Sequence, residues 1–209
     1  MDQTPQELMR SVQEGDEEAF KELVRRYNEP IRVFALRLLN DREKALDVAQ
    51  ETFIRVFTRA DGYRPVASFT GWLYRIAYHL SINEIRRQRR QPALPLETPS
   101  DSQHDGSPRF EARDGRDSPE ETLLGNERQE AVRRCVAALP AKYRGAVVMK
   151  DMEGLTFEEI ARILDCPEST VKSRVMRARR MLQQRLEPYL MRKAEAAPPA
   201  RPARQGARS

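Results

Sequence analysis

Apolar residues recur at helical spacing through the first ninety residues of the chain. Positions such as Ala19, Phe20, Leu23 and Val24 follow the i, i+3, i+4 rhythm of an amphipathic α-helix. Four helices are predicted here, over about 7–15, 16–39, 42–60 and 68–90. Asp16 provides a good N-cap for the second helix. We expect the fourth helix to turn Phe69, Trp72, Leu73, Ile76, Ala77 and Leu80 inward.

Helix-breaking residues divide this first part of the chain. Pro30 predicts a break or kink within the second helix, and Asn40-Asp41 predicts an end followed by a new N-cap. Asp61-Gly62 and Pro65 predict a loop before the fourth helix.

A second helical part follows a polar segment. Residues 91–118 contain four prolines, many Ser and Asp and few large apolar residues, a composition that cannot offset its ordering entropy by burial. Helices resume at Ser118-Pro119, end before Pro140, and continue from about Ala141 to Glu153, where Gly154 is a typical C′ residue. No strand pattern is found.

The predicted fold class is therefore all-α, with two small helical domains, a helical bundle and a helix-turn-helix, joined by a flexible linker. The expected boundaries are 1–90 for the first domain, 91–118 for an acidic linker, 119–191 for the second domain and 192–209 for a disordered basic tail rich in Ala, Pro and Arg.

A helix-turn-helix is predicted within the second domain. Thr156 and Glu159 fit a capping box, and Phe157, Ile160, Ala161 and Leu164 follow at helical spacing. Asp165-Cys166-Pro167 forms the turn, and a second helix runs from Glu168 to about Tyr189.

The second helix of this motif is predicted to have a buried apolar stripe on one side and a cationic face on the opposite side. Val171, Val175, Ala178 and Leu182 share one side. The opposite side holds Ser173, Met176, Arg177 and Arg180, and it is flanked by Lys172, Arg174 and Arg179. A solvated basic face is the commoner meaning of such a pattern. The capped helix and tight turn before it favour a helix that lies in a DNA major groove.

Charge and composition narrow the class of protein. The 209 residues carry a formal net charge of +5, and an acidic segment separates two basic blocks, which attract phosphate backbones. Cys135 and Cys166 form no metal-binding pattern, so we expect no metal, no cofactor and a reducing, cytoplasmic location. Each is interpreted as a packed residue, Cys135 in the core and Cys166 in the turn. No apolar run is long enough for membrane insertion, and no catalytic arrangement is evident.

Two surfaces in the first domain suggest partners. The helix over 42–60 turns Ala45, Leu46, Ala49, Phe53, Val56 and Phe57 to one broad side and shows Asp47, Gln50, Glu51, Ile54 and Thr58 on the other. An isoleucine on a polar face suits a protein interface, although the pattern alone favours a plain solvent face with one stray isoleucine. Four arginines between Arg86 and Arg90 suit either the helix dipole or a DNA backbone.

These stretches resemble a known family. Asp47–Phe53 (DVAQETF) and Phe69–Ala77 (FTGWLYRIA) are similar to region 2 of extracytoplasmic-function (ECF) sigma factors. Leu139-Pro140, Gly154–Ala161 (GLTFEEIA) and Thr170–Arg174 (TVKSR) are similar to region 4 of the same family. The two motif sets occur in family order around a linker, and the branch is the sigma-E type.

The resemblance implies a function and a set of partners. A sigma factor directs RNA polymerase core to specific promoters and initiates transcription, and an anti-sigma factor holds it inactive until a stress signal arrives. The resemblance assigns polymerase binding, at the clamp helices of the largest subunit, to Asp47, Gln50, Glu51 and Ile54. It implies no enzymatic activity for this chain.

The resemblance also assigns two sets of DNA contacts. The −10 element would meet Tyr63, Ser68, Phe69, His79, Asn83, Arg86 and Arg87. The −35 element would meet Ser169, Thr170, Lys172, Ser173, Arg174, Met176, Arg177 and Arg180. His79 stands where the sigma-E type usually has Asn, and Lys172 and Met176 stand where it tends to have Arg and an aromatic residue, so promoter specificity does not carry over.

Two alternatives remain at this point. A stand-alone helix-turn-helix repressor or activator explains residues 127–190 but leaves residues 40–90 without a purpose. A purely protein-binding regulator of polymerase predicts that replacing Lys172 and Arg177 with Ala leaves activity intact.

Overall fold

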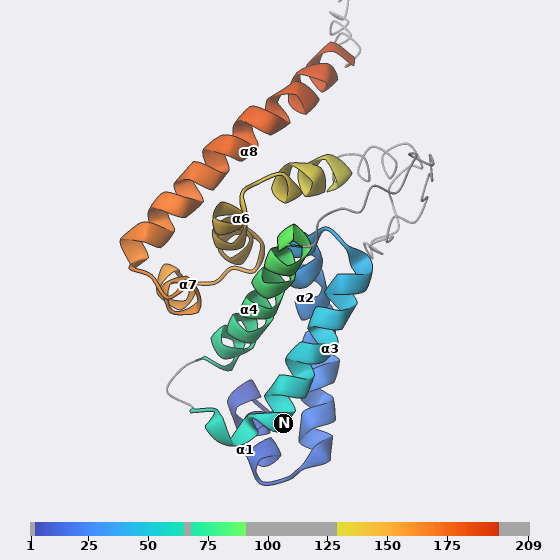
Figure 1. The fold of residues 1–209 in the computed structure, drawn as a ribbon, viewed down its shortest axis with the longest axis vertical. Coiled ribbons are helices and arrows are strands. Elements are labelled where there is room, and N and C mark those ends of the chain that lie inside the picture. The colour runs from blue at the N-terminus through green and yellow to red at the C-terminus, as the bar shows by residue number, and fades with distance from the viewer. Residues whose placement is uncertain (1–2, 65–67, 91–128, 197–209) are drawn as a thin grey trace, which may run out of the picture.

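The computed structural model describes residues 3–64, 68–90 and 129–196, and these are helical apart from short connections. The first part contains α1 (Pro5–Gln13), α2 (Glu17–Leu39), α3 (Arg42–Thr58), the short 3-10 turn η1 (Ala60–Gly62) and α4 (Phe69–Arg90). The second part contains a helix over 129–137, α6 (Ala141–Val147), the π-helical turn η2 (Val148–Met152), α7 (Phe157–Leu164) and α8 (Glu168–Ala196) (Figure 1).

This architecture confirms the predicted all-α class, because no strand occurs in the described ranges. The predicted linker over 91–118 and the start of the helix expected at Ser118 lie outside the described residues. Among the helices that are described, none is both long and apolar enough to cross a membrane.

Side-chain caps explain where the helices begin. The carboxylate of Asp16 accepts hydrogen bonds from the backbone N–H groups of Glu18 and Ala19, and that of Asp41 accepts one from Lys44. Asn40 ends α2 in the left-handed region, with φ 53°. Each arrangement satisfies backbone groups that a helix end leaves without a partner, so these predicted boundaries are confirmed.

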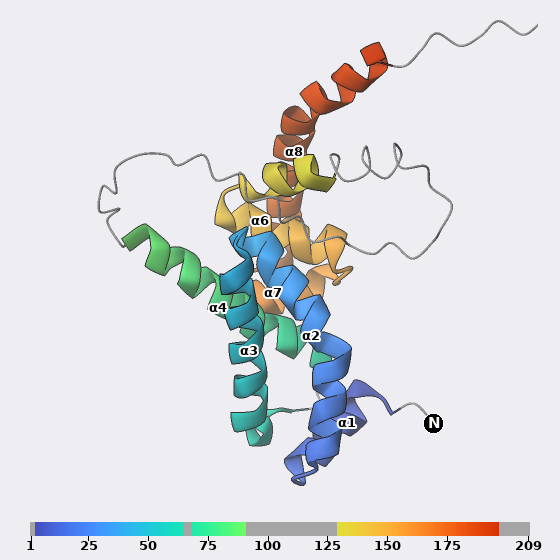
Figure 2. The same ribbon diagram turned by 90° about the vertical axis from the view of Figure 1, so that its right-hand side faces the viewer.

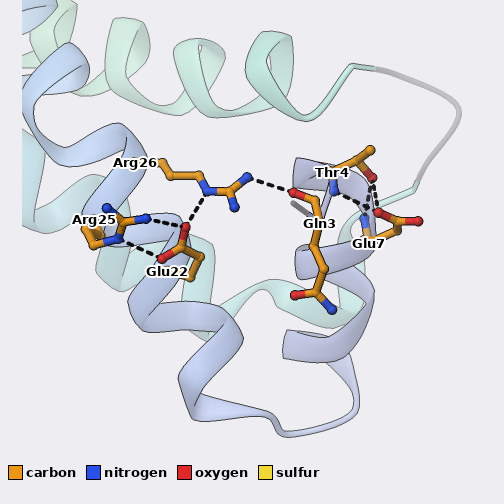
Figure 3. Close-up of polar contacts among 6 residues, drawn as sticks. All are labelled: Gln3, Thr4, Glu7, Glu22, Arg25 and Arg26. Atoms are coloured by element: carbon orange, nitrogen blue, oxygen red, sulfur yellow. Dashed lines mark hydrogen bonds and ion pairs between the residues drawn. The ribbon is translucent and has the colours of Figure 1, made fainter. Parts of the chain in front are cut away.

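The first helix begins earlier than its hydrophobic pattern predicts, because Thr4 and Glu7 form a capping box. Figure 3 shows this box beside a second polar cluster, in which Glu22 accepts hydrogen bonds from Arg25 and Arg26. Hydrogen bonds from these two guanidinium groups lower the pKa of Glu22 to about 2. Arg26 also donates to the backbone carbonyl of Gln3 at 2.7 Å and so ties the start of α1 to α2.

The break expected at Pro30 does not occur, and α2 is continuous through it. Proline within a helix removes one backbone hydrogen bond and costs about 3 kcal/mol. Leu23 lies before the proline and Ile31 and Phe34 after it, and all three are fully buried. Because one continuous helix buries both stretches against the same core, packing outweighs the local cost.

The first part is a bundle in which α2 packs against α1, α3 and α4. Its core contains Leu23, Ile31, Phe34, Leu38, Phe53 and Leu73. Aromatic rings join the helices edge to face, with the centroids of Phe34 and Tyr74 4.9 Å apart and those of Tyr27 and Phe69 5.4 Å apart. Such pairs are stabilising beyond their buried area.

The second part packs α6 and α7 against α8. Val171, Val175 and Ala178 are buried, which confirms the apolar stripe of the second helix in the motif. Gly154 follows the π-helical turn and its C-cap and has φ +71°, a conformation that favours glycine. Residues 192–196, expected in a disordered tail, instead continue α8. Arg, Lys, Ala and Glu fill these positions and are all good helix formers.

The two parts contact each other directly. In both ribbon views α4 lies beside the second part, and α4 packs against α7 while α2 packs against α6 and η2 (Figures 1 and 2). One continuous cluster of buried apolar residues reaches from Leu8 in α1 to Val175 in α8. The second part therefore presents its helix-turn-helix at the side of α4.

Candidate nucleic-acid interface and partner surface

The exposed side of α8 carries the residues predicted to read DNA. Ser169, Lys172, Ser173, Met176, Arg177 and Arg180 are exposed, and Thr170 and Arg174 are half-buried. Met176 is 71% exposed, although it is a large apolar side chain. A thioether held in solvent among cations suits contact with an apolar group such as a thymine methyl.

Lys172 is held by two neighbours in the helix-turn-helix. Its Nζ lies 2.6 Å from Oε1 of Glu168, one turn earlier on α8, and 5.6 Å from the centroid of the Phe157 ring on α7. A lysine is a point donor without the planar fork of arginine. The pairing of Lys172 with Glu168 was not predicted, although their i, i+4 spacing in the helix indicates it.

Two other arginines of α8 differ in their surroundings. Arg179 forms a two-pronged ion pair with Asp151, with N–O distances of 2.9 and 2.5 Å. The sequence pattern placed the Arg179 guanidinium beside the DNA-facing side of the helix. In the structure Asp151 binds that guanidinium instead. Arg177 lies beside Tyr143, whose pKa is lowered chiefly by a hydrogen bond from that arginine.

The motif that supports α8 forms as predicted. The Thr156 hydroxyl accepts from the N–H of Glu159 at 3.1 Å, and the Glu159 carboxylate accepts from the N–H of Thr156 at 2.9 Å. Asp165 turns the chain at φ 48°, a left-handed conformation that aspartate tolerates. Ile163 of α7 is buried and Leu164 is half-buried, so the inward face of α7 includes a residue that the spacing did not single out.

The two cysteines lie where the sequence placed them. Cys135 is buried, and Cys166 is half-buried in the turn and packs against the core. Neither forms a disulfide with the other.

The basic end of α4 presents the second candidate DNA surface. His79, Asn83, Arg86 and Arg87 are all exposed, and a shallow hollow is lined by Asn83, Arg86, Arg87 and Arg90. Glu84 accepts hydrogen bonds from Arg87, at 2.7 Å to its Nε, and so occupies part of that guanidinium. Partial desolvation of the exposed His79 ring by its neighbours lowers its pKa, and Arg75 and Arg86 lower it further.

Two residues of the predicted −10 set are buried in the structure. Tyr63 is 3% exposed and Phe69 is 0% exposed. Their rings pack against each other at 6.0 Å and against Trp72 at 5.1 and 6.2 Å. The gain from burying three aromatic rings together keeps them away from solvent. Ser68 remains half-buried and caps the N-terminus of α4, accepting from the N–H of Gly71.

The exposed face of α3 contains the four residues predicted to bind polymerase. Asp47, Gln50 and Ile54 are exposed and Glu51 is half-buried, and the side chain of Ile54 is 56% exposed. Leu46 and Phe57 were expected on the buried side but are also exposed. On a helical wheel, Leu46, Ile54 and Phe57 fall within an arc of roughly 80°. The spacing of these three apolar residues in the sequence could therefore have indicated a continuous apolar centre on this face.

The same two regions appear in comparisons with known protein families. Residues 23–91 match the family model described as Sigma-70 region 2, and residues 129–182 match Sigma-70, region 4. The chain is therefore a sigma-70-type transcription initiation factor, and one matched region falls in each of the two helical parts.

Relatives that are matched over most of their length agree with this class. The chain is 35% identical over 188 residues to the RNA polymerase sigma-H factor of Pseudomonas aeruginosa, covering 88% of this chain and 95% of the relative. It is 34% identical over 192 residues to the ECF RNA polymerase sigma-E factor of Escherichia coli, covering 90% and 97%.

The fold is also similar to that of solved structures. One is the sigma factor RpoE in complex with the anti-sigma factor NepR from Bartonella quintana, with a TM-score of 0.61, 24% identity, and coverage of 80% of this chain and 96% of that one. Another is CnrH in complex with the cytosolic domain of CnrY, with a TM-score of 0.62, 22% identity, and coverage of 88% and 97%. The chain belongs to the family of ECF RNA polymerase sigma factors.

Proposed function

We propose that this chain directs RNA polymerase core to specific promoters. It does so by making three separate contacts, one with the polymerase and two with promoter DNA. The observation that best supports this proposal is that one chain exposes three surfaces of different chemistry. These are an acidic and apolar face on α3, a basic end on α4 and a cationic face on α8. A repressor that acts alone needs only the last of them.

The chemistry of each surface supports one role. The face of α3 has an apolar centre with a polar rim, which suits a protein partner, and we assign it to the clamp helices of the polymerase. The face of α8 suits base edges in a major groove, with phosphate contacts from its later arginines. The arginines of α4 suit the backbone of the −10 element, beside His79 and Asn83.

Binding energy drives the opening of the promoter in this scheme. The chain hydrolyses nothing, and the chemistry of transcription belongs to the polymerase. Strand separation is stabilised when exposed groups on α4 bind the unpaired strand more tightly than the duplex. Tyr63 and Phe69 are left out of this surface because both are buried.

An anti-sigma factor is the proposed regulator, and the cytoplasm is the proposed location. The support comes from similar proteins: RpoE of Bartonella quintana and CnrH were both solved in complex with partners, NepR and CnrY. A partner that covers α3 or α8 of this chain would block the corresponding contact, and its release would link transcription to a stress signal.

Run-off transcription from a random promoter library tests the function. Purified core polymerase is supplied with and without this chain, and the transcribed templates are sequenced. We expect transcripts only in its presence, with two enriched elements at a constant spacing. Binding of the isolated chain to a palindrome, with no dependence on polymerase, would instead identify a stand-alone regulator.

A further inference from the structure

Gln13, the last residue of α1, holds the turn that leads into α4. Its side-chain Nε2 donates hydrogen bonds to the backbone carbonyls of Ala60 at 2.8 Å and of Tyr63 at 3.2 Å. A side-chain amide carries two N–H groups, so Gln13 uses both of them on the short turn η1 and the residue that follows it. The two carbonyls lie at the two ends of this turn, and α1 packs beside it (Figure 1). Gln13 therefore fixes the turn to a helix that is distant in the sequence.

The turn is anchored on its inner side and open to solvent on its outer side. Ala60 and Tyr63 are buried. The exposed positions of the turn and its flanks are Arg59, Asp61, Gly62 and Arg64. Within residues 3–64, 68–90 and 129–196, neither Arg59 nor Arg64 takes part in an ion pair. Two guanidinium groups that are exposed in this way suit the phosphate backbone of a nucleic acid.

The turn lies at the N-terminal end of the face of α4 that carries candidate −10 residues. One arc of about 80° on a helical wheel of α4 contains Trp72, Arg75, His79, Asn83 and Arg86. The ring of Tyr63 packs against that of Trp72, with centroids 5.1 Å apart, and so places the turn on this side of the helix. From Arg75 to Arg86 the exposed face extends for about 16 Å, at 1.5 Å per residue. Arg59 and Arg64 continue its positive charge beyond the start of α4.

We propose that Gln13 is a positioning residue for promoter opening, which fixes the turn so that Arg59 and Arg64 bind the backbone of the unpaired −10 strand. The DNA ligand in this proposal rests on the proposed function. Opening is favoured only by groups that bind the unpaired strand more tightly than the duplex. A turn that is already ordered loses less conformational entropy on binding than a free loop would lose, so its attachment to α1 strengthens that preference.

Three variants of the full-length chain separate the positioning role from general stability. Gln13→Met keeps the approximate length and volume of the side chain but removes both N–H donors. Thr4→Ala is the control, because it removes the cap at the other end of α1 and leaves the turn untouched. A double variant, Arg59→Ala with Arg64→Ala, removes the proposed DNA contacts and leaves Gln13 in place.

Hydrogen exchange of the free chain measures the turn without polymerase or DNA. The N–H of Gly62 donates to the carbonyl of Arg59 at 3.0 Å, and that of Tyr63 donates to the carbonyl of Ala60 at 2.9 Å. Both amide protons therefore report on local opening of the turn. They should exchange about fivefold or more faster in Gln13→Met, the factor that two ordinary hydrogen bonds represent, and change little in Thr4→Ala. Unchanged exchange in Gln13→Met would overturn the positioning role.

Run-off transcription with two forms of one promoter is the second measurement. The promoter is one recovered from the random library, either fully paired or with mismatches that keep its −10 element unpaired. At saturating holoenzyme, Gln13→Met should lower the yield from the paired template by about fivefold or more. The mismatched template should give nearly the wild-type yield, because the mismatches supply the strand separation.

The arginine double variant should show the same selective loss on the paired template. Adding Gln13→Met to it should lower the yield little further, because residues that act through one another are not additive. Equal losses on both templates, independent losses that add, or a selective loss in Thr4→Ala would each contradict the proposal. Failure of the proposed function is distinguishable: the wild-type chain would then give no transcript from either template, while the difference in hydrogen exchange between the wild-type chain and Gln13→Met would persist.

Discussion

Arg179 of the recognition helix and Asp151 of the π-helical turn form a bidentate ion pair, with the Nη2 of Arg179 2.5 Å from Oδ1 of Asp151. The pair joins positions 28 residues apart and fixes the middle of α8 to the segment that precedes the helix-turn-helix. Its arginine is therefore engaged within the protein, whereas Arg180 is exposed on the proposed DNA side.

This difference predicts unequal effects of two neighbouring substitutions. Arg180→Ala should weaken −35 binding by the holoenzyme about uniformly across −35 sequences, as the loss of a phosphate contact does. Arg179→Ala should cost less than about 1 kcal/mol in DNA binding, because its ion pair is with Asp151. Fluorescence anisotropy with labelled promoter DNA measures both. Equal losses would show that Arg179 leaves Asp151 to contact DNA.

Lys172 should determine specificity at a single −35 base pair. Lys172→Ala should lower discrimination at that pair by about 1–3 kcal/mol while leaving the other positions unchanged. The measurement is a binding selection with a −35 library. Glu168→Gln is the control: it removes the charge that pairs with Lys172 but keeps the base contact, so the preferred sequence should stay the same. A changed preference in that control would contradict the assignment.

The exposed face of α3 should control assembly with polymerase. Ile54→Glu and Asp47→Lys should each weaken binding to core polymerase by at least about tenfold, because each replaces a matched group at the interface with a charge of the wrong kind. Size-exclusion chromatography and titration with labelled core measure the effect. Glu187→Lys makes a comparable charge change at an exposed position of α8 and should assemble normally. Normal assembly of both α3 variants would exclude this face.

The two capping boxes offer a matched comparison. Thr156→Ala and Thr4→Ala each remove a threonine N-cap that accepts from the N–H of a glutamate three residues later, and each should lower the free energy of unfolding by about 1 kcal/mol. Only Thr156→Ala should also weaken −35 binding, because it loosens the helix that supports α8. Urea unfolding and DNA binding give the two readouts. If Thr4→Ala also weakened −35 binding, the weaker binding of Thr156→Ala would be explained by lower overall stability and not by the support of α8.

His79 should titrate below the ordinary histidine range near 6.5. Partial desolvation is the largest cause of its lowered pKa, followed by Arg75 and Arg86, with Asp165 acting in the opposite direction. The unfolded chain then binds the proton first, so the contribution of His79 to stability falls as the pH decreases through the ordinary range. An NMR titration measures this pKa, and Arg86→Ala should raise it. A pKa at or above the ordinary value would contradict the proposed surroundings.

The positions of helices and caps were largely predictable from local sequence. The capping box of Thr156 and Glu159, the turn at Asp165 and the buried stripe of α8 all depend on residues within about four positions of each other. The end of α2 at Asn40 and the start of α3 after Asp41 follow from the same kind of local chemistry. The exposed acidic face of α3 and the cationic face of α8 follow from the period of the helix.

Tertiary structure decided what distant residues do to one another. Tyr63 and Phe69 were predicted to meet the −10 element, and only the packing of their rings with Trp72 shows that both belong to the core. Pro30 is tolerated because burial on both sides of it outweighs a local cost. No periodicity could pair Arg179 with Asp151, or Glu153 with Arg37, since those contacts depend on how separate helices meet. Local hydrogen bonding thus determined the helices, and long-range burial and charge pairing determined which of their faces remain available.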